Sequence, residues 1–256
     1  MENIPLPSKI EIQPGKNANQ AAVSIQPCHP GYGTTLGNAL RRVLLSSLPG
    51  AAVTAFKIKG ASHEFSALSN VLEDLVEVAL NLKQLRLKVF SAEPVRLELK
   101  VKGEKDVTGA DFETSPQIEL VNPEVHVATI TDKKTELEID ITLEKGIGYE
   151  PKDKRNIKKT EIGSMVMDAI YTPIKNVNFH TENMRVAERT DFDKLSLEIE
   201  TDGTITPEEA FFDACDILIK HFNIIFAAKE SEVKEEKETV SKKETGKTVK
   251  KPKKKK

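Results

Sequence analysis

The sequence predicts an α+β fold in three parts. Residues 1–49 and 172–228 form a split α/β subdomain, a β-rich insert subdomain interrupts it over residues 50–171, and a disordered Lys/Glu-rich tail follows over residues 229–256. Three observations predict this. Strand and helix patterns recur at both ends, period-two alternation dominates the middle, and low hydrophobicity with blocks of charge marks the tail. The 256 residues fit one large domain or two modest ones, at about 100–200 residues per domain.

The N-terminal segment predicts two short strands followed by a helix. Period-two apolar runs over residues 10–12 and 23–25 are separated by a turn signal of Pro, Gly and Asn. A glycine-containing loop then leads into a helix that Thr34 or Thr35 can cap and that Pro49-Gly50 ends. The apolar stripe of this helix consists of Leu36, Ala39, Leu40, Val43, Leu44 and Leu48.

The insert predicts one helix and then strands. Asn70 and Glu73 have the spacing of a capping box and predict a helix that runs to Leu82. Apolar and charged residues alternate over residues 95–101 and 137–143, as in antiparallel strands with one solvated face. Polar loops are predicted at residues 103–116 and 145–159.

The last segment returns to strands and ends in a long helix. Residues 174–189 predict strand–turn–strand, and residues 195–199 predict another strand. Thr206 to Glu209 combine a Thr cap, Pro at the first helical position and Glu at the third, and the helix runs to about residue 228. Because its apolar residues occupy more than one side, we expect it to pack on its own sheet and on a second copy of the chain.

Charge is distributed unevenly along the chain. Residues 229–256 contain 12 Lys and 6 Glu, whereas residues 1–228 carry 26 basic and 34 acidic groups. The acidic body argues against a nucleic-acid-binding core. Residues 245–256 hold 7 Lys and no acid, which predicts weak, salt-sensitive attraction to nucleic acid; a tail that serves only solubility is the alternative.

The cysteine count and the hydropathy exclude several protein classes. Cys28 and Cys215 are too few for a disulfide framework or a four-ligand zinc site. No apolar run follows Met1 as in a secretory signal, and none approaches the roughly 20 residues that span a bilayer. We expect a cytoplasmic, reduced protein that makes no membrane contact.

No catalytic or metal-binding constellation is predicted. Gly31, Gly33 and Gly37 form a candidate phosphate loop, but their spacing differs from the dinucleotide fingerprint and no Gly-Lys-Ser/Thr follows. We expect a tight strand-to-helix turn, with Gly37 giving room for close packing. Cys28-His29 is interpreted as a surface pair before a turn, because adjacent side chains rarely face each other productively. The acidic ladder at residues 136–140 is interpreted as a solvated strand face.

Arg41-Arg42 is the unusual feature of the first helix. Two arginines on a helix otherwise devoted to burial must reach solvent or a partner. Arginine suits an interface because its guanidinium makes bidentate contacts and stacks. A solvated helix edge is the alternative.

Residues 31–47, Gly-Tyr-Gly-Thr-Thr-Leu-Gly-Asn-Ala-Leu-Arg-Arg-Val-Leu-Leu-Ser-Ser, closely resemble the bacterial RNA polymerase alpha-subunit family. The resemblance covers about residues 8–228, the family's N-terminal domain. Four further motifs support it in the same order: Glu73-Asp74 with Asn81-Leu82-Lys83, Gly146-x-Gly148-Tyr149-x-Pro151, Arg189-Thr190-Asp191-x-Asp193-Lys194-Leu195, and Gly203-Thr204-Ile205-x-Pro207-Glu208-Glu209-Ala210.

The resemblance implies a non-catalytic assembly platform within DNA-directed RNA polymerase, the nucleotidyltransferase that transcribes DNA from ribonucleoside triphosphates. Two copies dimerise through the α/β subdomain, and one docks the beta subunit while the other docks beta-prime. It implies beta-subunit docking by Arg42, supported by Asn38 and Arg41. Other large-subunit contacts are implied at Gly148, Tyr149, Arg185, Arg189 and Asp191.

The same resemblance implies a homodimer interface and further partners. The chain needs no cofactor, and the catalytic magnesium is expected in beta-prime. Omega, a sigma factor and DNA join the complex, which is expected in the cytoplasm at the nucleoid. The implied dimer contacts are Leu36, Leu40, Val43, Leu44, Phe211, Leu218, Phe222 and Ile225.

Two departures from the family pattern stand out. Cys28-His29-Pro30 replaces a stretch that is usually charged. The family also continues through a linker into a second, helical DNA-binding domain, whereas here we expect a Lys/Glu tail, whose terminal lysines would attract DNA non-specifically.

Two rival functions stay open from the sequence. An enzyme could use the loop at residues 31–37 for a phosphorylated ligand, which titration with nucleotides would reveal. A free-standing nucleic-acid-binding protein could act through its tail, and residues 1–228 alone would then lose all function.

Overall fold

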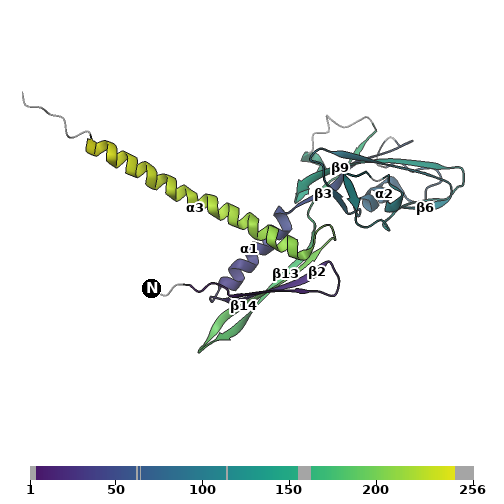
Figure 1. Ribbon diagram of the computed structural model, residues 1–256. Coiled ribbons are helices and arrows are strands. Elements are labelled where there is room, and N and C mark those ends of the chain that lie inside the picture. The colour runs from purple at the N-terminus through teal and green to yellow at the C-terminus, as the bar shows by residue number, and fades with distance from the viewer. Residues whose placement is uncertain (1–3, 62, 64, 114, 155–162, 246–256) are drawn as a thin grey trace, which may run out of the picture. The chain divides into compact units, whose positions relative to one another are not determined.

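The computed structural model describes residues 4–61, 63, 65–113, 115–154 and 163–245, with side chains described as far as residue 228 (Figure 1). The chain divides into two compact units, Met1–Ala214 and Cys215–Lys256. Strands dominate the first unit, and helices are fewer, so the predicted α+β class is confirmed.

The first sheet is antiparallel and joins segments from both ends of the chain, in the order β1-β2-β14-β13. The predicted strands near residues 10–12, 23–25 and 195–199 all lie in it. Leu195 pairs with Ile25, and Ile199 pairs with Ala21. The strands are β1 (Lys9–Pro14), β2 (Gln20–Cys28), β13 (Ile174–Val186) and β14 (Arg189–Thr201).

β13 corrects the prediction of strand–turn–strand over residues 174–189. It is one continuous strand of 13 residues, and the turn lies at Ala187 and Glu188. Most positions of β13 are exposed, so its polar residues are compatible with a continuous strand. Ala187 adopts φ 54°, the left-handed conformation that two-residue hairpin loops favour.

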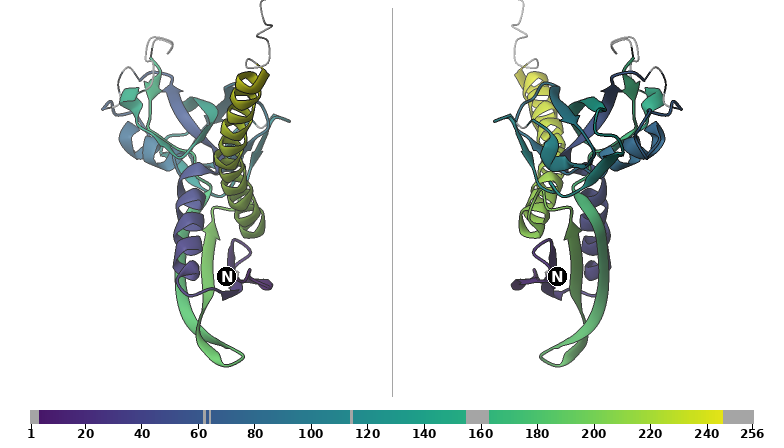
Figure 2. Two further views of the ribbon diagram at one scale, coloured as in Figure 1. Left: turned by 90° about the vertical axis from the view of Figure 1, so that its left-hand side faces the viewer. Right: turned by 90° about the vertical axis from the view of Figure 1, so that its right-hand side faces the viewer.

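The predicted first helix is α1 (Tyr32–Ser47), which packs on β13 and β14 (Figure 2). A Cβ on Gly33 would lie 2.9 Å from Thr181 Cγ2, and one on Gly37 would lie 2.5 Å from the Phe179 ring. Both positions therefore need glycine for the helix to approach the hairpin so closely. The expected packing role of Gly37 is confirmed.

The second sheet lies within the insert, in the order β11-β3-β9-β5. The two predicted alternating strands pair directly, with Val95 opposite Leu143 and Val101 opposite Leu137. Their apolar positions are buried and their charged ladder faces outward, as predicted. The strands are β3 (Pro49–Ile58), β5 (Val95–Lys102), β9 (Glu136–Ile147) and β11 (Met165–Val166).

The insert helix α2 (Leu75–Leu82) begins later than predicted. Asp74, not Asn70, is its N-cap, and its carboxylate accepts the Glu77 amide at 2.7 Å. The predicted capping box fails because Glu73 is bound elsewhere: it accepts the Thr129 amide at 2.7 Å and contacts His126 Nε2 at 2.8 Å. Burial alone would raise the pKa of Glu73, but these hydrogen bonds outweigh it and lower the pKa.

The two predicted polar loops contain regular structure, because their backbones pair with distant strands. Residues 103–116 include β6 and the 3-10 helix η1, and residues 145–159 include the end of β9, β10 and η2, while residues 155–159 lie outside the described residues. The short elements are β4 (Leu87–Val89), β6 (Lys105–Thr108), η1 (Gly109–Asp111), β7 (Ile118–Leu120), β8 (His126–Ile130), β10 (Tyr149–Glu150), η2 (Lys152–Lys154) and β12 (Ala169–Ile170).

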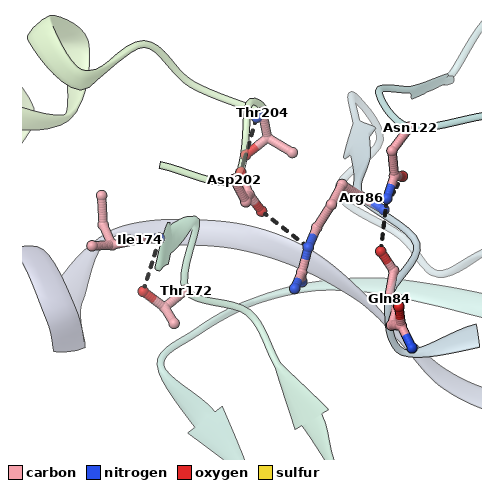
Figure 3. A network of polar contacts seen from close by, with 7 residues as sticks. All are labelled: Gln84, Arg86, Asn122, Thr172, Ile174, Asp202 and Thr204. Atoms are coloured by element: carbon pink, nitrogen blue, oxygen red, sulfur yellow. Dashed lines mark hydrogen bonds and ion pairs between the residues drawn. The ribbon is translucent and has the colours of Figure 1, made fainter. Parts of the chain in front are cut away.

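A polar network joins the insert to the strands of the first sheet (Figure 3). Arg86 Nε lies 3.9 Å from Asp202 Oδ2, and Asp202 Oδ1 accepts the amide and hydroxyl of Thr204 at 2.9 and 2.6 Å. On the insert side, Asn122 accepts the Arg86 amide at 2.7 Å and donates to the Gln84 carbonyl at 2.8 Å. The two sheets are separate, but the exact subdomain boundaries stay a prediction.

The last helix is α3 (Pro207–Thr245). Its predicted start is confirmed, because Glu209 donates its amide to Thr206 Oγ1 at 3.2 Å and accepts the Thr206 amide at 3.1 Å. Helical backbone continues to Thr245, past the predicted end at residue 228, while the predicted disorder of the tail stays a prediction. Residues 229–245 contain no Gly or Pro and are rich in Lys and Glu, which are good helix formers. Residues 246–256 lie outside the described residues.

We expect Gly37→Ala to destabilise the protein. Replacing a helical glycine by alanine stabilises a helix by about 1 kcal/mol, but forcing a methyl into a packed contact costs about 1–3 kcal/mol. With the Phe179 ring only 2.5 Å away, the steric term should prevail, for a net loss of about 1–2 kcal/mol in urea unfolding. In a Phe179→Leu background the same change should be neutral or stabilising; an equal loss in both backgrounds would refute the packing explanation.

Candidate functional site

The first turn of α1 is held by a carboxylate from β14. Asp193 Oδ2 accepts the amides of Gly31 and Gly33 at 2.9 and 3.1 Å. The predicted cap by Thr34 or Thr35 is wrong, since Gly31 is the N-cap, no side chain of the helix caps it, and Thr35 Oγ1 instead donates to the Gly31 carbonyl. The helix starts earlier than predicted because Gly31 enters it at φ 83°, a conformation open to glycine.

The same contact bears on the phosphate-loop hypothesis. The backbone amides that would cradle a phosphate are those of Gly31 and Gly33, and both already bind the Asp193 carboxylate. The helix N-terminus therefore has its anion within the chain. The loop at residues 31–37 is explained by capping and packing.

The outward face of α1 carries the predicted docking residues. Asn38, Arg41 and Arg42 are exposed, and with Leu45, which is 37% exposed, they follow the i, i+3, i+4, i+7 spacing of one helix face. Among the residues that the structure describes, neither arginine side chain has an intrachain ion pair or hydrogen bond. This face therefore offers two unpaired guanidinium groups beside an exposed leucine. Sequence reasoning missed Leu45 as part of it.

The hairpin of β13 and β14 carries the next group of predicted residues. Arg189 donates to both carboxylate oxygens of Asp191, at 3.1 and 2.7 Å, and its guanidinium carbon lies 5.2 Å from the centre of the Phe192 ring. The hydrogen bond from Arg189 lowers the pKa of Asp191. Arg185 donates to the Ala187 carbonyl at 2.8 Å. These exposed side chains are thus partly ordered by contacts within the hairpin.

Gly148 and Tyr149 lie near the other end of α1. A Cβ on Gly148 would lie 3.2 Å from the Ser46 carbonyl oxygen, and Gly148 itself adopts φ 68°. Tyr149 is 60% exposed, and its hydroxyl donates to Asp168 Oδ2 at 3.4 Å. The structure therefore places the predicted large-subunit contacts in two segments that are distant in sequence, the chain after β9 at one end of α1 and the β13–β14 hairpin at the other.

Asp168, which accepts the Tyr149 hydroxyl, also forms an ion pair with Lys83, the residue that follows α2. The hydrogen bond from the Lys83 ammonium holds the pKa of Asp168 below its ordinary value of 3.8, against a smaller opposing effect of burial. The pair fixes the chain after β11 against the end of α2.

The predicted dimer contacts separate into buried and exposed residues. Leu40, Leu44 and Phe211 are only 5%, 0% and 3% exposed, so they pack inside the chain. The prediction that these three residues contact a second copy directly is therefore corrected. Leu36, Val43 and Leu218 are half-buried, whereas Phe222 and Ile225 are 63% and 69% exposed. The apolar stripe of a helix cannot by itself separate residues that meet their own sheet from those that meet a partner. Other large apolar residues exposed on α3 are Phe212, Ile219, Ile224 and Phe226.

Cys28-His29 is not the surface pair that we predicted. Cys28 is 1% exposed, its thiol donates to the Ile25 carbonyl, and burial raises its pKa, which disfavours a nucleophilic thiolate. His29 packs edge-on against Tyr32 and Phe192. Within the described part of the chain, no group of three or more His, Cys, Asp or Glu is arranged to hold a metal ion. No described helix is long and apolar enough to cross a membrane.

Comparison with known proteins identifies the relatives of this chain. Residues 56–172 match the family described as the RNA polymerase Rpb3/RpoA insert domain. The DNA-directed RNA polymerase subunit alpha of Symbiobacterium thermophilum is 47% identical over 218 residues, which cover 84% of this chain and 69% of that protein. The protein of the same name from Oceanobacillus iheyensis is 43% identical over 235 residues, covering 90% and 74%. That of Chloroherpeton thalassium is 43% identical over 242 residues, covering 92% and 73%.

We expect Asp168→Asn to lower stability by about 1 kcal/mol at pH 7, because it weakens a charge-assisted contact. Since the folded-state pKa of Asp168 is lowered, this stabilisation is present above the unfolded value of 3.8 and disappears as the pH falls through the folded value. Urea unfolding from pH 7 to pH 3 should show the difference between wild type and variant shrinking. The exposed Glu124, changed to Gln, is the control; a difference that persists undiminished at pH 3 would contradict the ion-pair account.

Proposed function

This chain belongs to the DNA-directed RNA polymerase alpha-subunit family, and from that premise we propose that it is a homodimeric assembly platform that docks the beta and beta-prime subunits. In the assembled enzyme it supports transcription of DNA into RNA from ribonucleoside triphosphates. The observation that carries the proposal is the outward face of α1, where exposed arginines have no partner within the described chain while the first turn of the helix is held by Asp193.

We assign Arg42 as the anchor for the beta subunit, with Asn38 and Arg41 beside it. A guanidinium group makes planar, bidentate contacts, and such groups are enriched among residues that dominate binding energy. Leu45 adds an apolar contact at the same face. The body of the chain is acidic, so these two arginines present local positive charge to an acidic or carbonyl-rich patch on the partner.

Other large-subunit contacts are proposed on either side of this face. They come from the hairpin and from the segment after β9. Their ordered geometry, such as the bidentate Arg189–Asp191 pair, lowers the entropy lost on binding. The residues are Gly148, Tyr149, Arg185, Arg189 and Asp191.

Dimerisation is proposed through the apolar residues of α3 and the half-buried edge of α1. Phe222, Ile224, Ile225 and Phe226 are each 63–72% exposed in the single chain. Soluble proteins rarely leave such contiguous apolar surface in water, and its burial is favourable by about 25 cal/mol per Å². The dimerisation subdomain then comprises residues 1–49 and 172–228.

The chain holds no catalytic residue or cofactor, and the catalytic magnesium belongs to beta-prime. Omega, a sigma factor and DNA complete the complex, in the cytoplasm at the nucleoid. The lysines of residues 245–256 attract DNA weakly and non-specifically, and salt weakens this attraction.

Arg42→Ala should weaken capture of the cognate beta subunit about ten-fold or more while leaving the dimer intact. Binding is measured by surface immobilisation of the full chain, and mass by light scattering. Arg96→Ala, which removes an exposed arginine from the insert strand β5, is the matched control and should bind as wild type. Equal binding by both variants would remove Arg42 as the anchor; failure of the folded wild-type dimer to bind would reject the platform itself.

Phe222→Asp should shift the chain from dimer to monomer, because it places a charge in a proposed apolar interface. The residue is 63% exposed in the single chain, so the fold itself should be unaffected. Sedimentation at micromolar concentration measures the mass. The neighbouring Asn223→Asp adds the same charge at an exposed polar position and should stay dimeric; a dimeric Phe222→Asp would exclude this face.

A further inference from the structure

Asp193 joins two segments that are about 160 residues apart in the chain. Its Oδ2 atom accepts hydrogen bonds from the amides of Gly31 and Gly33, at the first turn of α1. A short carboxylate of the β14 strand thereby fixes where the helix begins. None of the amides at the start of a helix has a partner within the helix, so this contact satisfies donors that would otherwise need water.

The surroundings of Asp193 are built for this contact. No side chain of α1 caps its own N-terminus. A Cβ on Gly33 would lie 2.9 Å from Asp193 Cβ and 2.9 Å from Thr181 Cγ2, so a side chain at that position would push the amide away from the carboxylate. The positive end of the helix dipole also favours an anion here. Sterics, hydrogen bonding and charge thus select a carboxylate at position 193 and glycine at position 33.

The contact lies close to the proposed docking face. Asn38 follows Gly33 by five residues and Arg42 by nine, which is about 8 and 14 Å along the helix at 1.5 Å per residue. A tilt of the helix at its first turn would therefore displace the docking side chains. On β14, the Arg189–Asp191 pair lies just before Asp193 in the strand, and the Arg189 guanidinium carbon lies 5.2 Å from the centre of the ring of Phe192, the residue next to Asp193.

We propose that Asp193 is a positioning residue for large-subunit docking: it holds the first turn of α1 so that Asn38, Arg41 and Arg42 meet the partner in register. The proposal rests on the proposed function. It gives Asp193 a role through the backbone of α1, without direct contact to the partner.

The test uses the full chain with Asp193→Ala, Asp193→Asn and the control Glu198→Gln, an exposed carboxylate on the same strand. Hydrogen exchange of the amides of residues 31–35 reports the cap, light scattering reports the dimer, and surface binding reports affinity for the beta subunit. We expect Asp193→Ala to exchange at least ten-fold faster at the first turn and to bind beta about ten-fold more weakly as an intact dimer. Asp193→Asn keeps one acceptor oxygen and should be intermediate, and Glu198→Gln should match wild type.

A double-mutant cycle separates positioning from general destabilisation. If Asp193 acts through Arg42, then Asp193→Asn should have little further effect on beta binding in an Arg42→Ala background. Fully additive losses would overturn the positioning role, as would wild-type affinity in Asp193→Ala despite faster exchange. Asp193→Asn serves for the cycle even where the alanine variant does not fold. Failure of wild type to bind beta would instead reject the proposed function.

Discussion

The close approach of α1 to the β13–β14 hairpin is the constraint on which the rest of the first unit depends. Two glycines remove the side chains that would hold the helix away, and the Asp193 carboxylate then binds the amides that this proximity exposes. Neither the close packing nor the hydrogen bonds suffice alone. A larger residue at Gly33 would displace the carboxylate, and without the carboxylate the amides of the first turn would need water as their partner. Packing and hydrogen bonding therefore specify the same helix position.

This position determines what the outward face presents. Leu40 and Leu44 are buried beneath the helix, so Asn38, Arg41 and Arg42 must face away from the sheet. The far end of α1 passes Gly148, which the insert presents from the end of β9. The junction at Arg86 and Asp202 joins the insert to the residue that directly follows β14, the strand that carries Asp193. A surface of residues from distant segments is thus held by a few specific contacts.

Local periodicity predicted most of the fold. Alternation gave the strands around 95–101 and 137–143, and the spacing of apolar residues gave α1 and the start of α3. The errors at the starts of α1 and α2 share one physical cause, since in both a group is satisfied by a distant partner. The cap of α1 comes from β14, and Glu73 binds β8 instead of capping α2. At the site, too, local patterns predict some features and miss those that depend on a distant partner. The exposure of Arg41 and Arg42 follows from helical spacing, whereas no local signal reveals Asp193 as the cap.

The pKa shifts of the titratable groups are those expected of structural contacts and do not indicate a reactive site. The lowered pKa values of Asp168 and Asp191 arise from neighbouring Lys83 and Arg189, and burial raises the pKa of the Cys28 thiol, so each shift belongs to structural pairing or packing. An active site instead needs perturbed groups that converge where a substrate can bind. On the described face of α1 the opposite arrangement holds, with unpaired cations on an acidic chain. These are the groups that we propose for docking, and the surrounding pairs fix the backbone that presents them.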